Sequence, residues 1–139
     1  MVPYMALLLD THAAVWLSQG TELSPNVQQR ITAERNRDGV YLSAVTVWEV
    51  GNLVRRQRIA LGITLADWLN SFLDLGGFQT IDLSIEIVIG AANLPGSFHD
   101  DPADRFLVAT ARDLDVPILT RDTRILGYAK AGHLRAVGC

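Results

Sequence analysis

The chain has 139 residues, of which 49% are hydrophobic and 19% charged, and its 12 basic and 15 acidic residues give a formal net charge of −3 at pH 7. This length and apolar content are typical of one compact domain, which we expect over residues 1–139, and they exclude disordered and fibrous proteins. The mild acidity argues against a protein that coats nucleic acid by charge alone.

The ends of the chain and its cysteine content indicate a cellular location. No apolar run is long enough to cross the ~30 Å core of a bilayer, and residues 1–4 lack the basic stretch of a secretory signal. The single cysteine, Cys139, allows neither an internal disulfide nor a zinc–thiolate cluster. We therefore expect a cytoplasmic protein that does not associate with membranes.

Short apolar runs predict five strands, with helical stretches between most of them. The first run, Tyr4–Leu9, ends in three leucines without polar alternation, which is typical of a central strand covered on both faces. The other runs are Val40–Leu42, Phe78–Leu83, Pro117–Leu119 and Leu134–Val137. Strands that alternate with helices predict an α/β fold on a parallel sheet.

Capping residues and helical spacing predict the helices. Ser24 followed by Pro25 begins a helix that runs to about Arg35. In the stretch between Thr64 and Gly76, apolar residues recur at positions i, i+3, i+4, i+7 and i+8, which predicts a helix with one buried face. Further helices are expected within Ser43–Arg58, from Thr64 to Gly76 and from Asp101 to Leu114.

The segment that follows residue 80 allows two interpretations. Apolar and polar residues alternate from Ile81 to Ile87, and this pattern alone favours one long strand that continues to Ile89. Ser84 is also a good N-cap, and in that case the strand ends near Leu83 and a helix runs to Asn93.

Four acidic residues stand where a parallel sheet gathers functional groups. Asp10 ends the first strand, Asp122 closely follows the fourth, and Glu49 and Asp104 lie near the starts of helices. These positions share the carboxyl edge of the sheet, so we expect the four side chains to converge. Converging carboxylates repel one another and require a cation or shifted pKa values. Oxygen ligands without a His or Cys cluster favour Mg²⁺ or Mn²⁺ over zinc.

Each of these acids also has a purely structural explanation. Glu49 stands three residues after Thr46, which is the spacing of a capping box. Asp104 in the first turn of a helix favours the helix dipole, and Asp122 is suited to an Asx turn. Asp10 is the hardest to explain in this way, because an acid directly after three leucines is buried unless it caps the next helix.

The histidines and tryptophans near these acids are expected to have supporting roles. His12 and His99 each lie two residues from an aspartate, and no metal-ligand spacing links them, so we expect local hydrogen bonding around the site. Trp16, Trp48 and Trp68 all fall in helical stretches, and core packing is favoured over base stacking for them.

Taken together, four motifs resemble the PIN domain, and in particular the VapC-type toxins of bacterial toxin–antitoxin pairs. The motifs are Leu7–His12, Trp48–Val50, Asp101–Arg105 and Thr120–Asp122. Their order and spacing carry the resemblance, which covers nearly the whole chain. It implies a three-layer α/β/α sandwich on a parallel sheet of about five strands in the order 3-2-1-4-5. It also implies a helix after Asp82, which favours the interpretation with Ser84 as an N-cap.

The resemblance implies a Mg²⁺- or Mn²⁺-dependent endoribonuclease, a hydrolase that acts as a toxin. The catalytic acids of the family carry over to Asp10, Glu49, Asp104 and Asp122. We expect Asp10 and Asp104 to ligate the principal ion, and Glu49 and Asp122 to act through water or at a second ion. The positions of Thr11, Ser43 and Thr120 commonly support this site in the family. Four arginines near the acids in sequence are candidates to hold the RNA backbone, although the first of them is equally suited to pair with a carboxylate: Arg105, Arg112, Arg121 and Arg124.

The toxin resemblance also implies protein partners. We expect a cognate antitoxin whose C-terminal segment covers the acidic site, and a homodimer. The segment Thr64–Phe72, together with the basic run Arg55–Arg58, is amphipathic enough to offer an apolar groove, but ordinary core packing accounts for it equally well.

Two other functions share part of this sequence pattern. A haloacid-dehalogenase-type phosphatase also begins with an apolar strand that ends in aspartate, but it requires an acid two residues later, where this chain has His12. A catalytically inactive PIN-like binding module, in which the acids only cap helices, predicts no stabilisation by divalent metal, whereas the nuclease predicts it.

Overall fold

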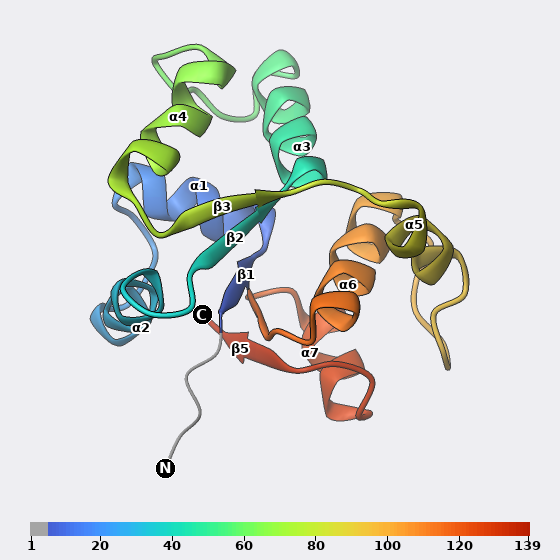
Figure 1. Ribbon diagram of the computed structural model, residues 1–139. Helices are drawn as coiled ribbons and strands as arrows, with labels where there is room; N and C mark the ends of the chain where they lie inside the picture. Colours follow the sequence, from blue (N-terminus) through green and yellow to red (C-terminus); the bar gives the residue numbers. More distant parts are fainter. Residues whose placement is uncertain (1–5) are drawn as a thin grey trace.

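The computed structural model describes residues 6–139, which form a five-stranded parallel sheet and seven helices (Figure 1). The strands are β1 Leu7–Leu9, β2 Val40–Ser43, β3 Phe78–Ile81, β4 Ile118–Thr120 and β5 Ala136–Gly138. The helices are α1 Thr11–Gln19, α2 Pro25–Arg35, α3 Ala44–Arg55, α4 Leu65–Leu75, α5 Ile85–Ala92, α6 Pro102–Leu114 and α7 Thr123–Lys130. The strand order is β3-β2-β1-β4-β5, and every neighbouring pair is parallel. The predicted sheet is confirmed.

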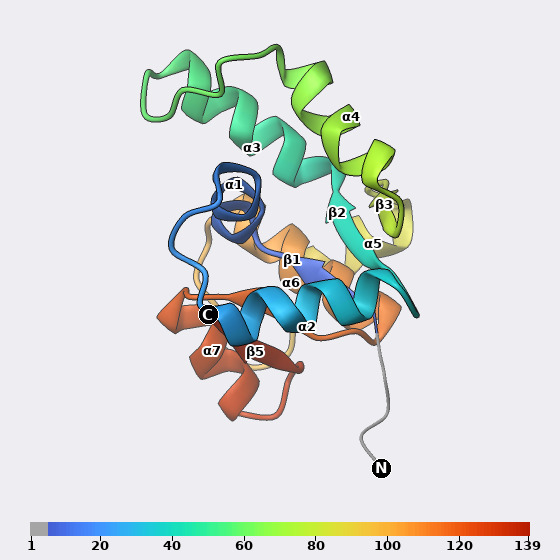
Figure 2. The same cartoon turned by 90° about the vertical axis from the view of Figure 1, so that its left-hand side faces the viewer.

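The central strand separates two apolar cores. Leu7 and Leu9 point to one face of the sheet and pack against α1, α2 and α4, whereas Leu8 points to the other face and packs against α6 and α7. All three leucines are fully buried. Figures 1 and 2 show the resulting layers, with helices on both sides of the sheet. The uninterrupted apolar sequence of β1 therefore follows from its burial on both faces.

The segment after β3 is a helix, as the resemblance implied. Ser84 is the N-cap of α5, and its hydroxyl accepts a hydrogen bond from the Ile87 backbone N–H (3.2 Å). Ile87 is buried, but Ile85 and Ile89 are 71% and 55% exposed. The alternation of this segment therefore does not mark the buried face of a strand, and β3 ends at Ile81, two residues earlier than predicted.

The other predicted elements agree with the structure to within a few residues. Ser24, Thr64 and Asp101 are the N-caps of α2, α4 and α6. Residues 4 and 5 of the predicted first strand lie outside the described part of the chain. The last strand begins at Ala136, two residues later than predicted, and the sequence patterns give no range for α1 or α7.

One of the three tryptophans contradicts the expectation of core packing. Trp68 is 2% exposed and makes an edge-to-face contact with Phe72 in the core. Trp48 is 62% exposed, because it lies about 200° around α3 from the buried Val50. Trp16 is half-buried beneath the Arg121 guanidinium, which lies 4.3 Å from its ring centroid. Within residues 6–139, no helix is long and apolar enough to cross a membrane.

Candidate active site

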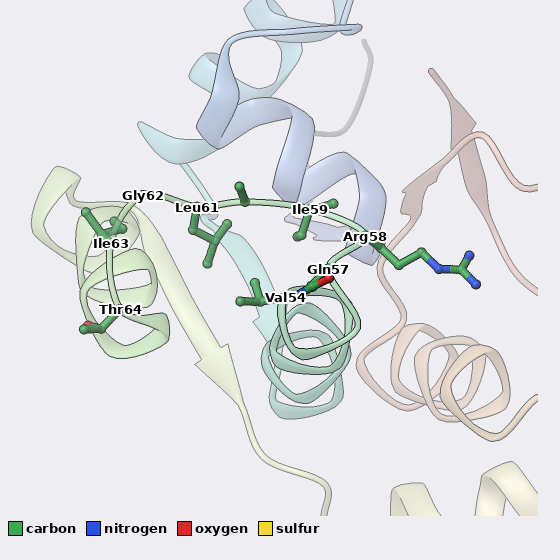
Figure 3. A pocket seen from close by; sticks show the side chains of 9 residues that line it. Val54, Gln57, Arg58, Ile59, Leu61, Gly62, Ile63 and Thr64 are labelled. Atoms are coloured by element: carbon green, nitrogen blue, oxygen red, sulfur yellow. The ribbon is translucent and has the colours of Figure 1, made fainter.

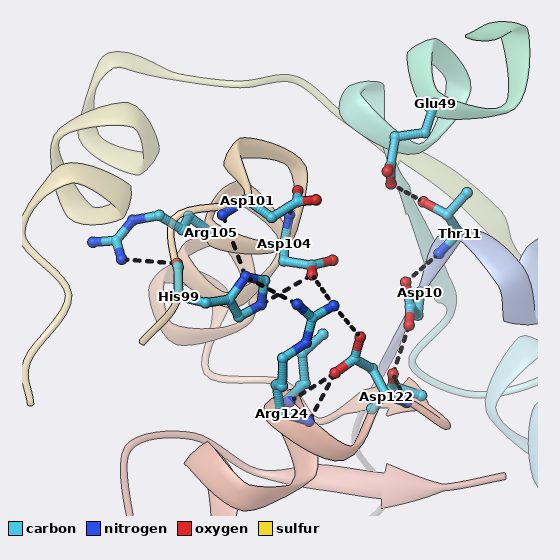
Figure 4. A network of polar contacts seen from close by, with 11 residues as sticks. Asp10, Thr11, Glu49, His99, Asp101, Asp104, Arg105, Asp122 and Arg124 are labelled. Atoms are coloured by element: carbon cyan, nitrogen blue, oxygen red, sulfur yellow. Dashed lines mark hydrogen bonds and ion pairs between the residues drawn. The ribbon is translucent and has the colours of Figure 1, made fainter. Parts of the chain in front are cut away.

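The four predicted acids line a single pocket of about 360 Å³ at the carboxyl edge of the sheet (Figure 4). Asp10 and Asp122 follow β1 and β4, and Glu49 and Asp104 come from α3 and α6. A fifth carboxylate, Asp101, lies in the same pocket. The other residues that line it are Thr11, His12, Trp16, Arg121 and Arg124.

Asp10 is a buried carboxylate whose two oxygens are both hydrogen-bonded. It is the N-cap of α1 and is 8% exposed. Its Oδ1 accepts from the Thr11 backbone N–H (2.6 Å), and its Oδ2 accepts from the Thr120 hydroxyl (2.5 Å). Burial raises its pKa, and the hydrogen bonds from Thr120 and Thr11 counter part of that rise. Asp10 therefore combines the expected capping role with a place at the bottom of the pocket.

Glu49 does not belong to a capping box. Ser43 is the N-cap of α3, so Glu49 lies in the second turn, too far along the helix to cap it. Its Oε1 accepts a hydrogen bond from the Thr11 hydroxyl, and the buried Thr46 hydroxyl lies 3.3 Å from that of Thr11. Burial raises the pKa of Glu49, and the charges of neighbouring acids raise it further. The capping interpretation of Glu49 is wrong, and its carboxylate is directed to the pocket.

Asp104 has the most strongly perturbed pKa of the described carboxylates. Its backbone N–H donates to Asp101 Oδ1 (3.2 Å) in the first turn of α6, so the helix-dipole interpretation also holds. Burial raises the pKa of Asp104 to about 7, together with the negative charges of four acids in the same pocket: Asp101, Asp10, Asp122 and Glu49. The mutual repulsion expected from the sequence is therefore present.

His99 supports Asp104 from the side, as Figure 4 shows. Its Nδ1 accepts from the Asp101 backbone N–H (3.3 Å). Its Nε2 is buried and lies 3.1 Å from Asp104 Oδ2, at an angle that does not make a hydrogen bond. The expected role of His99 beside the site agrees with these contacts.

Asp122 caps α7 and is the one acid of the predicted four with a lowered pKa. Its Oδ1 accepts from the backbone N–H groups of Arg124 (2.8 Å) and Ile125 (3.3 Å). Burial acts to raise the pKa of Asp122, but the hydrogen bonds from the Arg124 side chain and backbone outweigh it. Asp122 is thus ionised and held in place by the start of α7.

Two of the four candidate arginines reach the pocket. Arg124 Nη2 lies 3.2 Å from Asp122 Oδ2 and 3.6 Å from Asp104 Oδ2, so its guanidinium bridges the two acids. Arg121 stacks on Trp16 and pairs with Glu22 (3.1 Å) at the rim. Both side chains are in reach of a ligand at the pocket.

The other two arginines do not line this pocket, and their contact with RNA stays a prediction. Arg105 is used structurally, and it donates to the backbone carbonyls of Ala91, Phe98 and His99. Arg112 donates to the carbonyl of His133, which lies beyond α7. Helical phase explains Arg105, which follows Asp104 directly and therefore points about 100° away from it.

The polar residues around the acids were only partly predicted. Thr11 and Thr120 contact the acids directly, as expected. Ser43 instead caps α3 by accepting from the Val45 backbone N–H (3.1 Å), so its contribution is to orient the helix that carries Glu49. In the sequence, the doubled acid Asp100–Asp101 competes with Asp104 for the place in the site, and the helical spacing favours Asp104; in the structure the side chain of Asp101 lines the pocket as well.

Comparison with known proteins identifies the family. Residues 7–131 match the family model of the PIN domain. This chain belongs to the PIN-domain family. It is also 32% identical over 123 residues to ribonuclease VapC22 of Mycobacterium tuberculosis, a match that spans 88% of this chain and 91% of that protein. The predicted likeness to VapC-type PIN domains is confirmed.

Solved structures share the fold of this PIN domain. The structure of VapBC2 from Rickettsia felis, bound to a DNA fragment from its promoter, superposes with a TM-score of 0.72 at 14% identity and covers 96% of this chain and 98% of that one. FitAcB from Neisseria gonorrhoeae gives a TM-score of 0.64 at 21% identity, with 94% and 95% of the two chains covered. At these identities the likeness establishes the arrangement of elements.

The donor set of the pocket fits a hard divalent cation. Its five carboxylates are oxygen ligands of the kind that Mg²⁺ and Mn²⁺ prefer. Three of them, Asp10, Glu49 and Asp104, have raised pKa values, which a bound cation would lower. As they stand, no three His, Cys, Asp or Glu side chains within residues 6–139 are close enough together to hold one ion. A hard ion such as Mg²⁺ is commonly held by one or two carboxylates and completes its coordination with water, which agrees with this spacing.

A second hollow lies where α3 runs into the loop before α4 (Figure 3). It is lined mainly by apolar residues: Val54, Gln57, Arg58, Ile59, Ala60, Leu61, Gly62, Ile63 and Thr64. Its position differs from the groove anticipated along Thr64–Phe72, because Trp68 and Phe72 are buried in the core. Core packing is thus the correct explanation for α4, and the loop before it forms the groove.

Proposed function

We propose that this PIN domain is a metal-dependent endoribonuclease that hydrolyses RNA phosphodiester bonds. The observation that carries the proposal is the convergence of Asp10, Glu49, Asp104 and Asp122 in one pocket, where the pKa values of the first three are raised. Such perturbed carboxylates mark functional sites. The name of its relative, ribonuclease VapC22, supports the same reaction.

In this proposal Asp10 and Asp104 hold the principal Mg²⁺ or Mn²⁺. They line the same pocket from the end of β1 and the start of α6, and their charges interact. A divalent ion, when bound, stabilises charge on the phosphate oxygens and lowers the pKa of a bound water. Glu49 and Asp122 complete the site through water or at a second ion.

The residues around the acids have distinct tasks. The hydroxyls of Thr120 and Thr11 fix the orientations of Asp10 and Glu49. Arg121 and Arg124, at the rim, supply positive charge for the phosphate groups of an approaching RNA. Such charge is needed because the carboxylates alone repel a polyanion.

The proposal extends to a toxin that is held inactive by a cognate antitoxin. Its support is the VapC likeness together with the solved VapBC2 and FitAcB structures, and a further structural match is described as a toxin–antitoxin complex from Klebsiella pneumoniae. Homodimerisation stays a prediction, which light scattering on the purified protein checks. Co-expression with the gene adjacent to that of this protein tests the pairing, because a toxin arrests growth alone and a cognate antitoxin restores it.

One observation favours a second candidate, a PIN-like binding module without activity. Asp10, Asp101 and Asp122 are all N-caps, so helix capping alone accounts for three of the five acids. That alternative predicts no response to divalent metal. The phosphatase alternative is excluded by membership of the PIN-domain family.

Thermal unfolding with and without metal separates the two candidates. We expect Mn²⁺ or Mg²⁺ to raise the melting temperature of the wild-type protein and to leave that of Asp104→Asn unchanged. Asp113→Asn is the matched control, because it makes the same substitution at an exposed position of the same helix. A metal response that persists in Asp104→Asn contradicts the assigned site.

Cleavage of a structured RNA tests the activity itself. We expect cleavage by the wild-type protein and Asp113→Asn with Mg²⁺, and none with a chelator or in Asp10→Asn or Asp104→Asn. Equal cleavage in all samples would show that the reaction does not use these acids.

A further inference from the structure

The Arg124 guanidinium lies between two acids of the pocket, one of which, Asp104, is a proposed metal ligand. Its Nη2 lies 3.2 Å from Asp122 Oδ2 and 3.6 Å from Asp104 Oδ2, and its Nη1 lies 3.5 Å from His99 Nδ1. Figure 4 shows the guanidinium between the carboxylates of α6 and α7. It therefore joins acids from two elements that are brought together only by the fold.

The side chain of Arg124 is not part of the packing of the protein. Its side chain is 57% exposed, whereas those of Asp104 and Asp122 are 14% and 24% exposed. A long exposed side chain loses little contact area when it changes rotamer. Arg124 is thus free to leave the acids without disturbing α7, because the N-cap bonds of α7 are donated by the backbone N–H groups of Arg124 and Ile125 to Asp122 Oδ1 and do not involve the guanidinium.

We infer that Arg124 is a resident counter-cation of the acid pocket, which a divalent ion displaces when it binds. The inference rests on the proposed metal-dependent function. The guanidinium and a metal ion held by Asp10 and Asp104 compete for the Asp104 carboxylate, and two positive charges at this separation repel. Displacement leaves the guanidinium at the rim, where a phosphate group is the next available anion. The Arg124 guanidinium thus exchanges its contact with the protein's carboxylates for a contact with a phosphate group of the substrate, which it helps to position.

The competition also accounts for the spacing of the carboxylates. No three acidic, His or Cys side chains among the described residues are close enough together to hold one ion, although five carboxylates line one pocket. A guanidinium is larger than a metal ion and holds Asp104 and Asp122 on either side of itself. Its departure frees the Asp104 carboxylate for a smaller cation.

Calorimetric titration of the protein with Mn²⁺ tests this inference without any RNA. We expect Arg124→Gln to bind Mn²⁺ about tenfold more tightly than the wild type, because a competing charge is removed. Arg124→Lys keeps the charge but lacks the planar fork that spans two carboxylates, so its affinity is expected to lie between the two.

Arg121→Gln is the matched control. It removes the same charge from the rim of the same pocket, but Arg121 pairs with Glu22 and not with a proposed ligand. We expect its affinity for Mn²⁺ to stay within about threefold of the wild type. Equal tightening in Arg121→Gln and Arg124→Gln would show a general effect of charge and overturn the inference.

A second measurement follows the side chain itself. In ¹⁵N-labelled protein, the Arg124 Nε–Hε signal, assigned by its loss in Arg124→Gln, is expected to shift as Mg²⁺ saturates the site. A signal that does not move, or an unchanged Mn²⁺ affinity in Arg124→Gln, overturns the inference. If Mn²⁺ binds neither the wild type nor Arg124→Gln, the proposed function fails as well. Binding that Asp104→Asn abolishes but Arg124→Gln does not tighten contradicts the displacement alone.

Discussion

A single hydroxyl group links two of the proposed catalytic acids. Thr120, fully buried at the end of β4, donates to Asp10 Oδ2 (2.5 Å) and accepts from the Asp122 backbone N–H (3.0 Å). The bond to Asp10 is the largest influence that counters the effect of burial on the pKa of that carboxyl. Thr120 therefore keeps Asp10 closer to its ionised, metal-binding form.

We expect Thr120→Val to weaken Mn²⁺ binding about tenfold at neutral pH, because loss of this hydrogen bond raises the pKa of Asp10 further and protons then compete with the metal. Calorimetric titration measures the change. Thr110→Val is the control, since Thr110 is equally buried but donates to the Phe106 carbonyl of its own helix (2.7 Å). Identical affinities in Thr120→Val and the wild type would refute this role.

Asp104 makes the stability of the metal-free protein depend on pH. Its pKa is about 7 in the folded protein and 3.8 in the unfolded chain, so between these values the folded state binds the extra proton. The stabilisation from this group is fully present below pH 3.8 and is lost as pH rises through 7. In the presence of a chelator, we therefore expect the protein to lose stability between pH 5 and 8.

Asp104→Asn removes this dependence, because an amide does not titrate. Relative to the wild type, we expect the variant to gain on the order of 2 kcal/mol of unfolding free energy between pH 5 and 8, after discounting for solvent screening. Urea unfolding at several pH values in a chelator measures the difference. Parallel pH profiles for the two proteins would be inconsistent with the raised pKa.

At the scale of elements, the turn that leads into β3 depends on glycine. Gly77 has φ +80°, and a Cβ atom there would lie 2.3 Å from the Arg35 carbonyl oxygen at the end of α2. Both the backbone conformation and the lack of space therefore exclude a side chain. This contact fixes where β3 starts relative to α2.

We expect Gly77→Ala to destabilise the protein by about 3 kcal/mol or more, because the backbone has to move either in the turn before β3 or at the end of α2. Gly62→Ala is the matched control, since Gly62 has a similar φ of +74° but open space around its Cα. We expect Gly62→Ala to lower the free energy of unfolding by about 1 kcal/mol, because only the backbone conformation is unfavourable there. Urea unfolding of both variants checks the difference, and equal costs would contradict the importance of the close approach.

The sequence predicts elements well where the signals are local. The apolar run Leu7–Leu9 and the caps Ser24 and Thr64 depend only on nearby residues, and the structure confirms them. The alternation after Ile81 was misleading because the exposure of Ile85 is set by how α5 packs on α6. Trp48 was misassigned for the same reason, since a helix of apolar residues does not reveal which face is buried.

The candidate site was predictable in its acids but not in its wider surroundings. The positions of Asp10 and Asp122 after strands of a parallel sheet predict their convergence, and the structure places them in one pocket. By contrast, Arg105 directly follows Asp104 and Arg124 stands two residues after Asp122, and only the orientation of their helices directs Arg124 but not Arg105 into the pocket. The placement of these two arginines depends on contacts between elements that are distant in sequence, which a local pattern does not reveal.

At the scale of the whole molecule, the net charge of −3 is unevenly distributed. If the four predicted acids are set aside, 15 − 4 leaves 11 acidic residues against 12 basic ones, so the excess of negative charge is concentrated in the pocket. Repulsion within such a cluster is weakened by dissolved salt.

We expect KCl to raise the melting temperature of the metal-free wild-type protein more than that of Asp104→Asn, because the variant has one repelling charge fewer. MgCl₂ at the same ionic strength is expected to stabilise the wild type more than KCl does, since binding adds to screening. Differential scanning fluorimetry gives both comparisons. Equal effects of the two salts would mean that screening alone relieves the repulsion.

The position of Arg121 connects the pocket to residue 139. Its Nε donates to the Cys139 carbonyl (2.7 Å), and its Nη2 donates to the Glu22 carbonyl (3.1 Å), while its guanidinium lies over Trp16. One side chain thus fastens β5, the loop after α1 and a wall of the pocket to each other. A purification tag or fluorophore joined after Cys139 would therefore be attached beside the hydrogen bond between Arg121 and the Cys139 carbonyl, and close to the pocket. A tag joined before residue 6 would be attached at the opposite end of β1 from Asp10.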